Sequence, residues 1–412
     1  MKKILVKISD NKKYIEDIML SILSNGIPLI ILQLIILPLV NSDVGEELYG
    51  LLITIISVFT FVASTSAGSL NNVRLILNEK YEEENIKGDF NLIQVFFAFG
   101  NALLVVVISF VYTREWSPVQ IFLLVLVTLL ICAEGYYSVG FRLQINYKRR
   151  LIQKILLTLG YVIGFFLYRL TEQWLLIYVI GYLLDVIYVL RKTDLIKEPW
   201  SITKFFPIAI KNEAVLIIAS LIGGLTMYID RLIIYPIYGG LISSTYYVAT
   251  LLGKVISLAI VPISGVLLSY FAKIKKLEDS ILKKMRKFSW VVGIIGYIVC
   301  LIVSRPILGL LYPTIVDDAM VFVPVTLVCS VIDVQNTMMS PVVLKYCKIT
   351  KQIWISLINV VGYLVISIVF MQFWGLMGFC VGGIVTALIK YIIYSFMYSR
   401  ENRNNSNQEA GD

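Results

Sequence analysis

The residues with the clearest chemical potential in this sequence are charged side chains inside long apolar segments. Asp333 lies near the middle of the apolar segment 321–343, and Lys254 lies inside the segment 245–270. A charge at mid-membrane depth costs about 2.5–3.5 kcal/mol on insertion scales, so each needs a partner or an aqueous surrounding. A carboxylate in such a place can carry a proton or a metal cation, and an ammonium group can hold an anion.

Hydroxyl side chains accompany both charges at helical spacing. Steps of three and four residues place one set on a single helix face, namely Thr326, Ser330, Asp333, Thr337 and Ser340. Lys254 shares its face with Tyr247, Thr250 and Ser257. Such residues either bond neighbouring helices in a dry bundle or line a water-filled cavity. The pattern favours a cavity around Asp333. For Lys254 a cationic cavity site and a structural pair, for instance with Asp333, remain equally open.

Further polar residues extend this candidate set. Glu134 and Asp185 are acids inside apolar segments, while Asn212 and Asp230 lie on a small, polar face of the segment 208–229. A proton or a sodium ion could be carried by Glu134, Asp185, Asp333 or Asp230. Asp185 has a second interpretation as an interfacial residue, because it is close in sequence to Arg191.

Three basic residues at predicted cytoplasmic ends of apolar segments could line an inner vestibule. These are Arg74, Arg142 and Lys211. They are equally well explained as ordinary anchors, because cytoplasmic loops of membrane proteins carry an excess of Lys and Arg.

Several classes of chemistry are excluded by composition. The chain has no histidine, which removes Ser-His-Asp triads and histidine metal sites. Its five cysteines lie in or beside apolar segments and show no disulfide or metal spacing. No phosphate-binding or dinucleotide-binding motif is present. We therefore expect no catalytic residue, no metal and no cofactor.

The elements that must position these residues are membrane-spanning helices. Of the 412 residues, 58% are hydrophobic and 15% are charged, against about 45–50% and 25% in soluble domains. The apolar residues fall in blocks long enough to cross a bilayer, which needs roughly 20 helical residues. Twelve spans are predicted, at 18–40, 48–70, 91–112, 119–141, 151–168, 174–190, 208–229, 245–270, 288–303, 321–343, 352–370 and 376–398.

The basic residues predict the orientation of these spans. With the N-terminus in the cytoplasm, 29 of the 36 Lys and Arg residues fall in inward segments and only 4 in outward loops. Both termini are therefore predicted to be cytoplasmic. The net charge of +9 follows this alternation, so we expect membrane lipids as a partner and no nucleic acid.

The two halves of the chain show a weak internal repeat. Pro38 precedes Tyr49 by the same 11 residues that separate Pro236 from Tyr247. Six spans per half would give parallel repeats related by an axis along the membrane normal. We predict two six-helix bundles around a central cavity, at 1–190 and 207–399, with a cytoplasmic linker at 191–206 and a disordered polar tail at 400–412.

Two motifs resemble the polysaccharide flippases of the multidrug/oligosaccharidyl-lipid/polysaccharide exporter superfamily. One runs from Met227 through Asp230-Arg231 to Tyr246-Tyr247-Val-Ala and a later Pro262. The other is the entry Glu47-Leu-Tyr-Gly-Leu-Leu to the second span. The resemblance covers the whole chain as architecture and about 70 residues as motif. Several relatives have fourteen spans, whereas this chain has room for twelve.

The resemblance implies a non-enzymatic exporter in the cytoplasmic membrane. It would move undecaprenyl-pyrophosphate-linked oligosaccharide repeat units to the outer leaflet, with polysaccharide polymerase machinery as a partner. Lys254 and Arg231 would face the anionic substrate, and Asp230 would orient Arg231. A cation-coupled multidrug antiporter of the same superfamily is one alternative, which Glu134 and Asp333 keep open. A polytopic polysaccharide polymerase or glycosyltransferase is another, although the outward loops are short.

Overall fold

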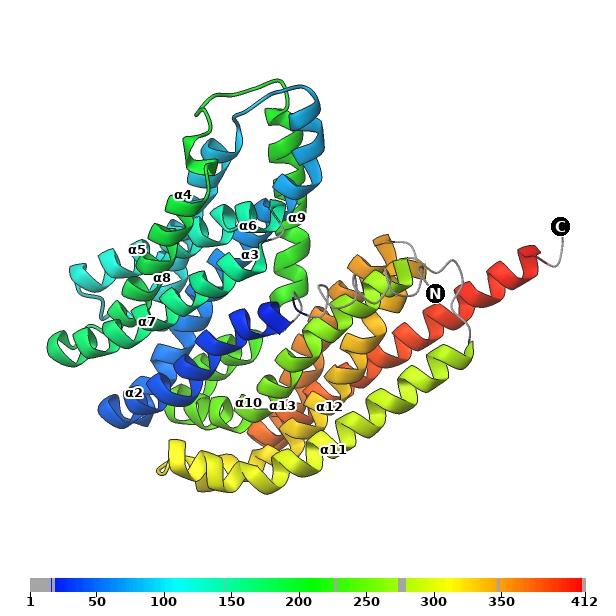
Figure 1. The fold of residues 1–412 in the computed structure, drawn as a ribbon. Coiled ribbons are helices and arrows are strands. Elements are labelled where there is room, and N and C mark those ends of the chain that lie inside the picture. The colour runs from blue at the N-terminus through cyan, green and yellow to red at the C-terminus, as the bar shows by residue number, and fades with distance from the viewer. Residues whose placement is uncertain are drawn as a thin grey trace. The chain divides into compact units, whose positions relative to one another are not determined.

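The structure is a computed structural model that describes residues 16, 19–144, 146–225, 228–272, 279–346 and 349–409. Side chains are described within these ranges except at 223, 255, 257–259, 261–263, 265–272, 279–281, 344–353 and 398–409. The regular structure of the described residues is helical, without strands, which confirms the predicted all-α class (Figure 1). Ser257, a predicted cavity residue, lies outside the described side chains.

The helices follow one another with short connections. In chain order they are the first helix Met19–Val44, which includes η1 (Leu32–Ile36) and α2 (Leu37–Val44), then α3 (Glu46–Glu83), α4 (Phe90–Tyr112), α5 (Pro118–Tyr137), α6 (Val139–Leu143), α7 (Tyr147–Thr171), α8 (Leu176–Lys192), η2 (Leu195–Lys197), α9 (Phe206–Leu225), α10 (Ile229–Ala272), α11 (Asp279–Leu311), α12 (Val316–Tyr346) and α13 (Ile349–Glu409).

Eight helices among the described residues are long and apolar enough to cross a membrane. One of them, Trp354–Met397, has 44 residues, about twice the length that one crossing needs. Its backbone is non-helical at Trp374 and Gly375, so it divides where two separate spans are predicted. The number of twelve crossings and the side of each terminus remain predictions.

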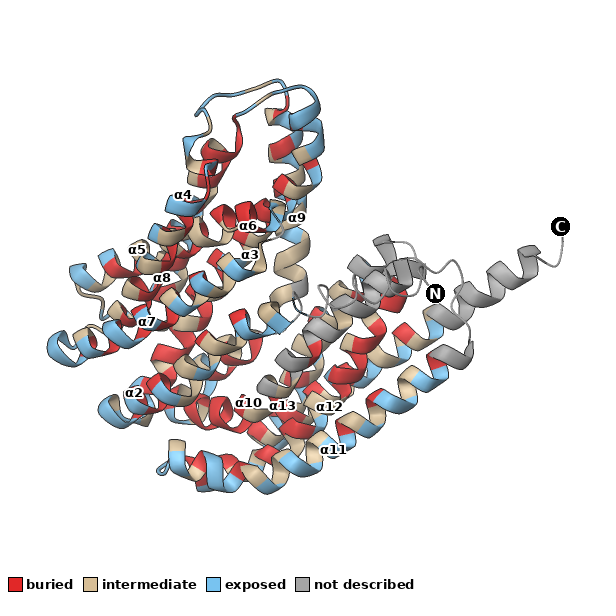
Figure 2. Cartoon of the chain, in the orientation of Figure 1, coloured by how far each residue is buried: buried red, intermediate tan, exposed pale blue. Residues whose placement is uncertain are grey.

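Apolar stripes on the protein surface show where lipid would contact the helices. On α11 the exposed side chains Phe288, Val291, Ile295, Ile298 and Ile302 recur every three or four residues. This spacing gives one continuous apolar face, which Figure 2 shows as exposed and intermediate colours along α11. A soluble protein would bury such a face, whereas a helix in hydrocarbon turns it outward.

The chain divides into two compact units, Met1–Gly240 and Leu241–Asp412. In the first unit α3 packs against α4, α5 and α9, and α7 packs against α8. In the second unit α12 packs against both α11 and α13. The sequence analysis placed the boundary earlier, in the linker 191–206. Because α9 packs on α3, it groups here with the first unit, and its membership of a C-terminal bundle remains a prediction.

Several helices extend beyond the predicted spans. α3 continues thirteen residues past the predicted end at 70, since no glycine or proline interrupts 71–83. α10 begins at Ile229, the last residue of the predicted span 208–229, and continues through 230–244, which was expected to be an outer loop. α13 is helical to Glu409, where a disordered tail was expected from 400. The segment 399–409 also contains no glycine or proline that would end a helix.

The segment between α8 and α9 is bound to the turn between α3 and α4. Asn91 donates from Nδ2 to the carbonyl oxygens of Leu195 and Glu198, at 3.2 and 3.1 Å. Asp89 accepts a 2.6 Å hydrogen bond from the backbone N–H of Thr203. Gly88, with φ of +139°, leaves room for this contact, because a Cβ there would lie 2.8 Å from Ser201 O. This predicted linker is therefore fixed along its length.

Helices α7 and α8 approach closely through glycines. A Cβ on Gly160 would lie 2.6 Å from the Cα of Gly181, and one on Gly164 would lie 2.5 Å from Leu176 O. The motif Gly160-x-x-x-Gly164 therefore packs backbone against backbone, as small residues do between membrane helices. This contact brings Gln153 and Lys154 of α7 within hydrogen-bond distance of Asp185 on α8.

We expect Gly160→Ala to destabilise the protein by about 1–3 kcal/mol, because the added methyl group overpacks the α7–α8 contact. Thermal unfolding in detergent would measure the change. Gly100→Ala on α4 is the matched control, since nothing lies within 4 Å of a Cβ there. Equal melting temperatures for the two variants would contradict the close contact.

Candidate functional site

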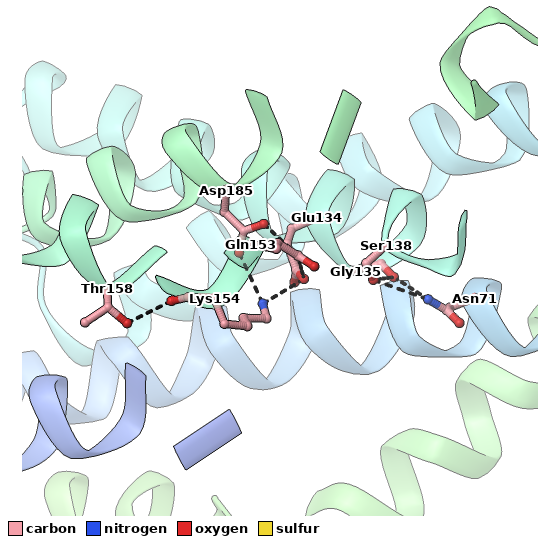
Figure 3. Close-up of polar contacts among 8 residues, drawn as sticks. All are labelled: Asn71, Glu134, Gly135, Ser138, Gln153, Lys154, Thr158 and Asp185. Atoms are coloured by element: carbon pink, nitrogen blue, oxygen red, sulfur yellow. Dashed lines mark hydrogen bonds and ion pairs between the residues drawn. The ribbon is translucent and has the colours of Figure 1, made fainter. Parts of the chain in front are cut away.

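A lysine and two acids from three helices form a buried ion cluster in the first unit (Figure 3). Nζ of Lys154 on α7 lies 2.8 Å from Oε1 of Glu134 on α5 and 3.1 Å from Oδ2 of Asp185 on α8. The side-chain amide of Gln153 donates to both carboxylates at 2.7 Å. Gln153 and Asp185 are fully buried. The cluster thus ties α5, α7 and α8 together.

The local sequence places these side chains by allowing close helix contacts. Gly135, next to Glu134, lets α5 meet α3, because a Cβ there would lie 2.5 Å from Cβ of Ala67. Asn71 of α3 donates to the carbonyl oxygen of Gly135 at 2.8 Å. Together with the glycine contact between α7 and α8, this places the polar side chains of α5, α7 and α8 side by side among otherwise apolar surroundings.

The arrangement supplies the two acids with an internal cation. The ammonium group of Lys154 occupies the place between Glu134 and Asp185 that a bound cation would otherwise take. Among the described residues no group of three or more Cys, Asp or Glu side chains could hold a metal ion. The role of Glu134 and Asp185 in ion coupling remains a prediction, but this geometry gives them a structural partner.

Sequence reasoning found the acids of this cluster but missed its other half. Lys154 was counted among the basic residues of an inward segment, although it also falls at the start of the predicted span 151–168; α7 begins at Tyr147, and Lys154 lies two turns inside it. The alternative that Asp185 is an interfacial residue near Arg191 does not describe its contacts, which are to Gln153 and Lys154. The available signal was Lys154 itself, within the apolar segment beginning at 151.

The predicted substrate residue Arg231 lies in the first unit and is buried. It opens α10 next to Asp230, and its Nη1 donates to Oγ of Ser57 on α3 at 2.9 Å. Asp230 accepts from the backbone N–H of Arg231 at 2.9 Å. Asn212 is partly buried on α9. The structure therefore brings Arg231 against α3, a contact that the sequence did not predict.

Gly239 and Gly240 of α10 pack closely against the beginning of α3. Glu47 accepts a 2.9 Å hydrogen bond from the backbone N–H of Gly240. A Cβ on Gly240 would collide with the carbonyl oxygen of Glu47, and one on Gly50 would collide with that of Gly240. Gly239 has φ of +80°, which only glycine adopts readily. This contact positions Arg231 beside Ser57.

In the second unit, the polar faces of α10 and α12 meet each other. Thr326 donates to the carbonyl oxygen of Ala249 at 2.9 Å, and Ser264 donates to that of Thr337 at 2.9 Å. Between these points a Cβ on Gly253 would collide with Oγ of Ser330. Two of the predicted cavity hydroxyls, those of Thr326 and Ser330, thus lie at a helix–helix contact. This agrees with the dry-bundle interpretation for that part of the stripe.

The remaining candidates of the second unit differ in exposure. Tyr247 and Thr250 are buried, and Thr250 donates to Tyr247 O at 3.1 Å. Lys254, one turn further, is half-buried. Asp333 is exposed, near Cys329 on its own helix and within electrostatic range of Lys390 on α13. An exposed carboxylate in mid-segment agrees with an aqueous surrounding, since lipid would not tolerate it.

Two of the three predicted vestibule residues, Arg74 and Arg142, make structural contacts. Arg74 forms two hydrogen bonds to the Glu198 carboxylate, at 2.7 and 3.1 Å, and its guanidinium carbon lies 4.7 Å from the centre of the Phe90 ring. Burial raises the pKa of Glu198, and Arg74 opposes that change. Arg142 donates to Oδ1 of Asn71 at 2.6 Å. Lys211 is exposed.

Glu213 is a buried acid that the sequence analysis did not single out. It lies on α9 with no exposed surface, and neither carboxylate oxygen has a hydrogen-bond partner among the described residues. The signal for it was available, because an acid seven residues after the start of an apolar helix is unusual.

The fold described above is shared with solved structures of membrane transporters and of a flippase. No protein-family model and no curated protein sequence matches the chain. Solved structures do match. The lipid II flippase MurJ, in an inward closed conformation, aligns with a TM-score of 0.72 at 13% identity, covering 95% of this chain and 90% of its own.

Two MATE structures are also similar. A MATE bound to MaL6 aligns with a TM-score of 0.66 at 12% identity, covering 94% of this chain and 96% of its own. An outward-facing multidrug resistance MATE transporter aligns with a TM-score of 0.64 at 14% identity, covering 93% and 96%. At these identities the similarity establishes the fold, and the substrate has to be argued from the residues.

We expect Lys154→Met to lower stability by about 3–5 kcal/mol, because it leaves two buried carboxylates without a cation. Thermal unfolding of the purified protein would measure this. Lys148→Met is the control, since its side chain is 75% exposed. Adding Glu134→Gln and Asp185→Asn should restore much of the loss, and a triple variant no more stable than Lys154→Met would contradict the ion-cluster argument.

Proposed function

We propose that this protein moves an undecaprenyl-pyrophosphate-linked oligosaccharide across the cytoplasmic membrane, by alternating access, for surface polysaccharide synthesis. The fold supports the proposal, because a lipid II flippase shares it over nearly the whole of both chains. The motifs around Asp230-Arg231 and Glu47, which resemble those of polysaccharide flippases, also support it.

The observation that carries the proposal is the half-buried Lys254 in the middle of α10. A pyrophosphate is strongly anionic, and lysine binds phosphate groups as a compact point charge. A drug transporter that takes up organic cations would gain nothing from an ammonium group at this depth. Lys254 therefore favours an anionic, phosphate-bearing substrate.

The sugar portion sets a second requirement. Each hydroxyl moved from water into hydrocarbon without a hydrogen-bond partner costs several kilocalories per mole, so the oligosaccharide needs a polar path. The prenyl tail has no such need and can remain in lipid. The apolar stripe of α11 offers the second environment, and the half-buried Lys254 of α10 with the exposed Asp333 of α12 offers the first, within one unit.

The alternative of a cation-coupled multidrug antiporter rests on Asp333. Its exposed carboxylate could bind an organic cation, and MATE transporters share the fold. The two proposals differ in the charge they require, so they are separable by substrate.

Deletion of the gene should cause lipid-linked oligosaccharide to accumulate on the inner leaflet. Sugar labelling from the outside of cells and of inverted vesicles would measure the distribution. Resistance to organic cations should be unchanged. Normal outer-leaflet delivery together with increased sensitivity to organic cations would instead support the antiporter.

Lys254→Ala should lower outer-leaflet delivery at least tenfold without preventing membrane insertion, because a lost charged contact to phosphate is worth about 1.5–3 kcal/mol. Asp333→Asn should have a smaller effect on this substrate. Lys283→Ala, at an exposed position on α11, is the matched control. Full activity of Lys254→Ala would assign Lys254 a structural role.

A further inference from the structure

The side chain of Glu213 is buried in the first unit without a polar contact that would stabilise an ionised carboxylate. Its residue is completely buried, and both oxygens lack a hydrogen-bond partner among the described residues. An isolated ionised carboxylate in an apolar surrounding is so unfavourable that the group takes up a proton instead. Even the neutral carboxyl group costs about 1–3 kcal/mol when its hydrogen bonds are unmade.

The apolar cluster that surrounds this position belongs to the contact between α9 and α3. Ala209, one turn before Glu213 on the same helix face, is buried in a cluster with Val73 and Leu77 of α3. Two turns after Glu213, Ser220 receives a hydrogen bond from Ser69 of α3 at 3.1 Å. Glu213 therefore lies between two fixed points of the α3–α9 contact.

The charged and titratable groups of the elements around this contact are engaged elsewhere. On α3, Arg74 binds Glu198, and Lys80 lies 4.6 Å from the ring centre of Phe205. Tyr81 of α3 donates to Asp89 at 2.6 Å. None of these groups forms an ion pair with Glu213 among the interactions of the described residues.

The titratable groups of α5 and of α9 itself also form no ion pair with Glu213 among the interactions of the described residues. Tyr137 of α5, in the same apolar cluster, donates to Oδ1 of Asn91 at 3.0 Å, and Tyr136 is buried beside it. On α9 itself, Lys211 is exposed to solvent. Glu213 thus differs from Glu134 and Asp185, which share the ammonium group of Lys154.

We propose that Glu213 is a proton-binding site, protonated while α9 packs on α3 and deprotonated when that contact opens to water. The chemistry is a single exchange, in which the carboxylate takes a proton from water and releases it again, with no other bond changed. A proton fits better than a sodium ion, because neither Glu213 oxygen has a hydrogen-bond partner among the described residues, so no hydroxyl group is in place beside it to act as a further ligand.

Proton binding and helix packing are then linked equilibria. Whatever favours the neutral carboxyl group favours the closed α3–α9 contact, and an alkaline medium favours the open one. If the protein is the transporter proposed above, one proton would bind and leave Glu213 in each cycle. The linkage itself does not depend on the identity of the substrate.

Disulfide cross-linking of Ser69→Cys with Ser220→Cys would test the proposal in the full-length protein. The native cysteines are first replaced, and the two positions are already 3.1 Å apart as hydroxyls. We expect the cross-linked fraction to fall several-fold from mildly acidic to alkaline pH. With Glu213→Gln added, which mimics the neutral carboxyl group, it should stay high at every pH.

A control pair corrects for the pH dependence of thiol chemistry. In this control Cys132 is kept, the other native cysteines are replaced, and Asn101→Cys is added to pair α4 with α5, where Nδ2 of Asn101 and Sγ of Cys132 lie 3.6 Å apart, away from α9. The proposal is overturned if Glu213→Gln leaves the pH profile unchanged relative to this pair. It is also overturned if Glu213→Gln lowers cross-linking equally at all pH values, since that would indicate a structural role.

The same variant separates this inference from the proposed function. Loss of the pH effect in Glu213→Gln, with no translocation of lipid-linked oligosaccharide by the unmodified protein, would support the proton site and refute the flippase. Translocation by the unmodified protein, with an unchanged cross-linking profile in Glu213→Gln, would support the flippase and refute the proton site.

Discussion

The absence of water between packed helices is the constraint on which this structure depends. A charge inside the membrane has to find its partner within the protein, and the cluster of Lys154 with Glu134 and Asp185 satisfies that condition for three helices at once. The direction of α5, α7 and α8 relative to one another follows from this requirement and from the glycines that let their backbones meet. Polar contacts and small residues thus act together with the buried apolar cluster of the first unit.

Polar residues in the two units satisfy this constraint in different ways. In the first unit Lys154, Glu134 and Asp185 are buried and mutually bonded, whereas the buried carboxylate of Glu213 lacks a hydrogen-bond partner among the described residues. In the second unit hydroxyl groups join α10 to α12, while Lys254 is half-buried and Asp333 is exposed. The first pattern gives rigidity. In the second, the charged side chains keep part of their surface accessible.

Much of the fold could be predicted because membrane crossing imposes a length and a polarity on each segment. The apolar runs correctly indicated helices throughout the described chain, and the small residues of 160–164 indicated a close contact. The partners of the charged residues could not be predicted, because they depend on which helices touch. Lys154 was counted only as one of the inward positive charges, and the contact of Arg231 with Ser57 joins residues 174 positions apart. Glu213 was overlooked because its burial follows from the position of α9.

The connection between α8 and α9 has a mechanical consequence. It is held by Asn91, by Asp89 and by the pair of Arg74 with Glu198, so it has no slack. A flexible connection without these hydrogen bonds would let the first turn of α9 shift while the turn between α3 and α4 stayed in place. Here a displacement at either end must be passed to the other, or the hydrogen bonds between them must break. The connection therefore limits how far α9 can move. It also couples any movement of α9 to the last turns of α3 and to the turn that follows them.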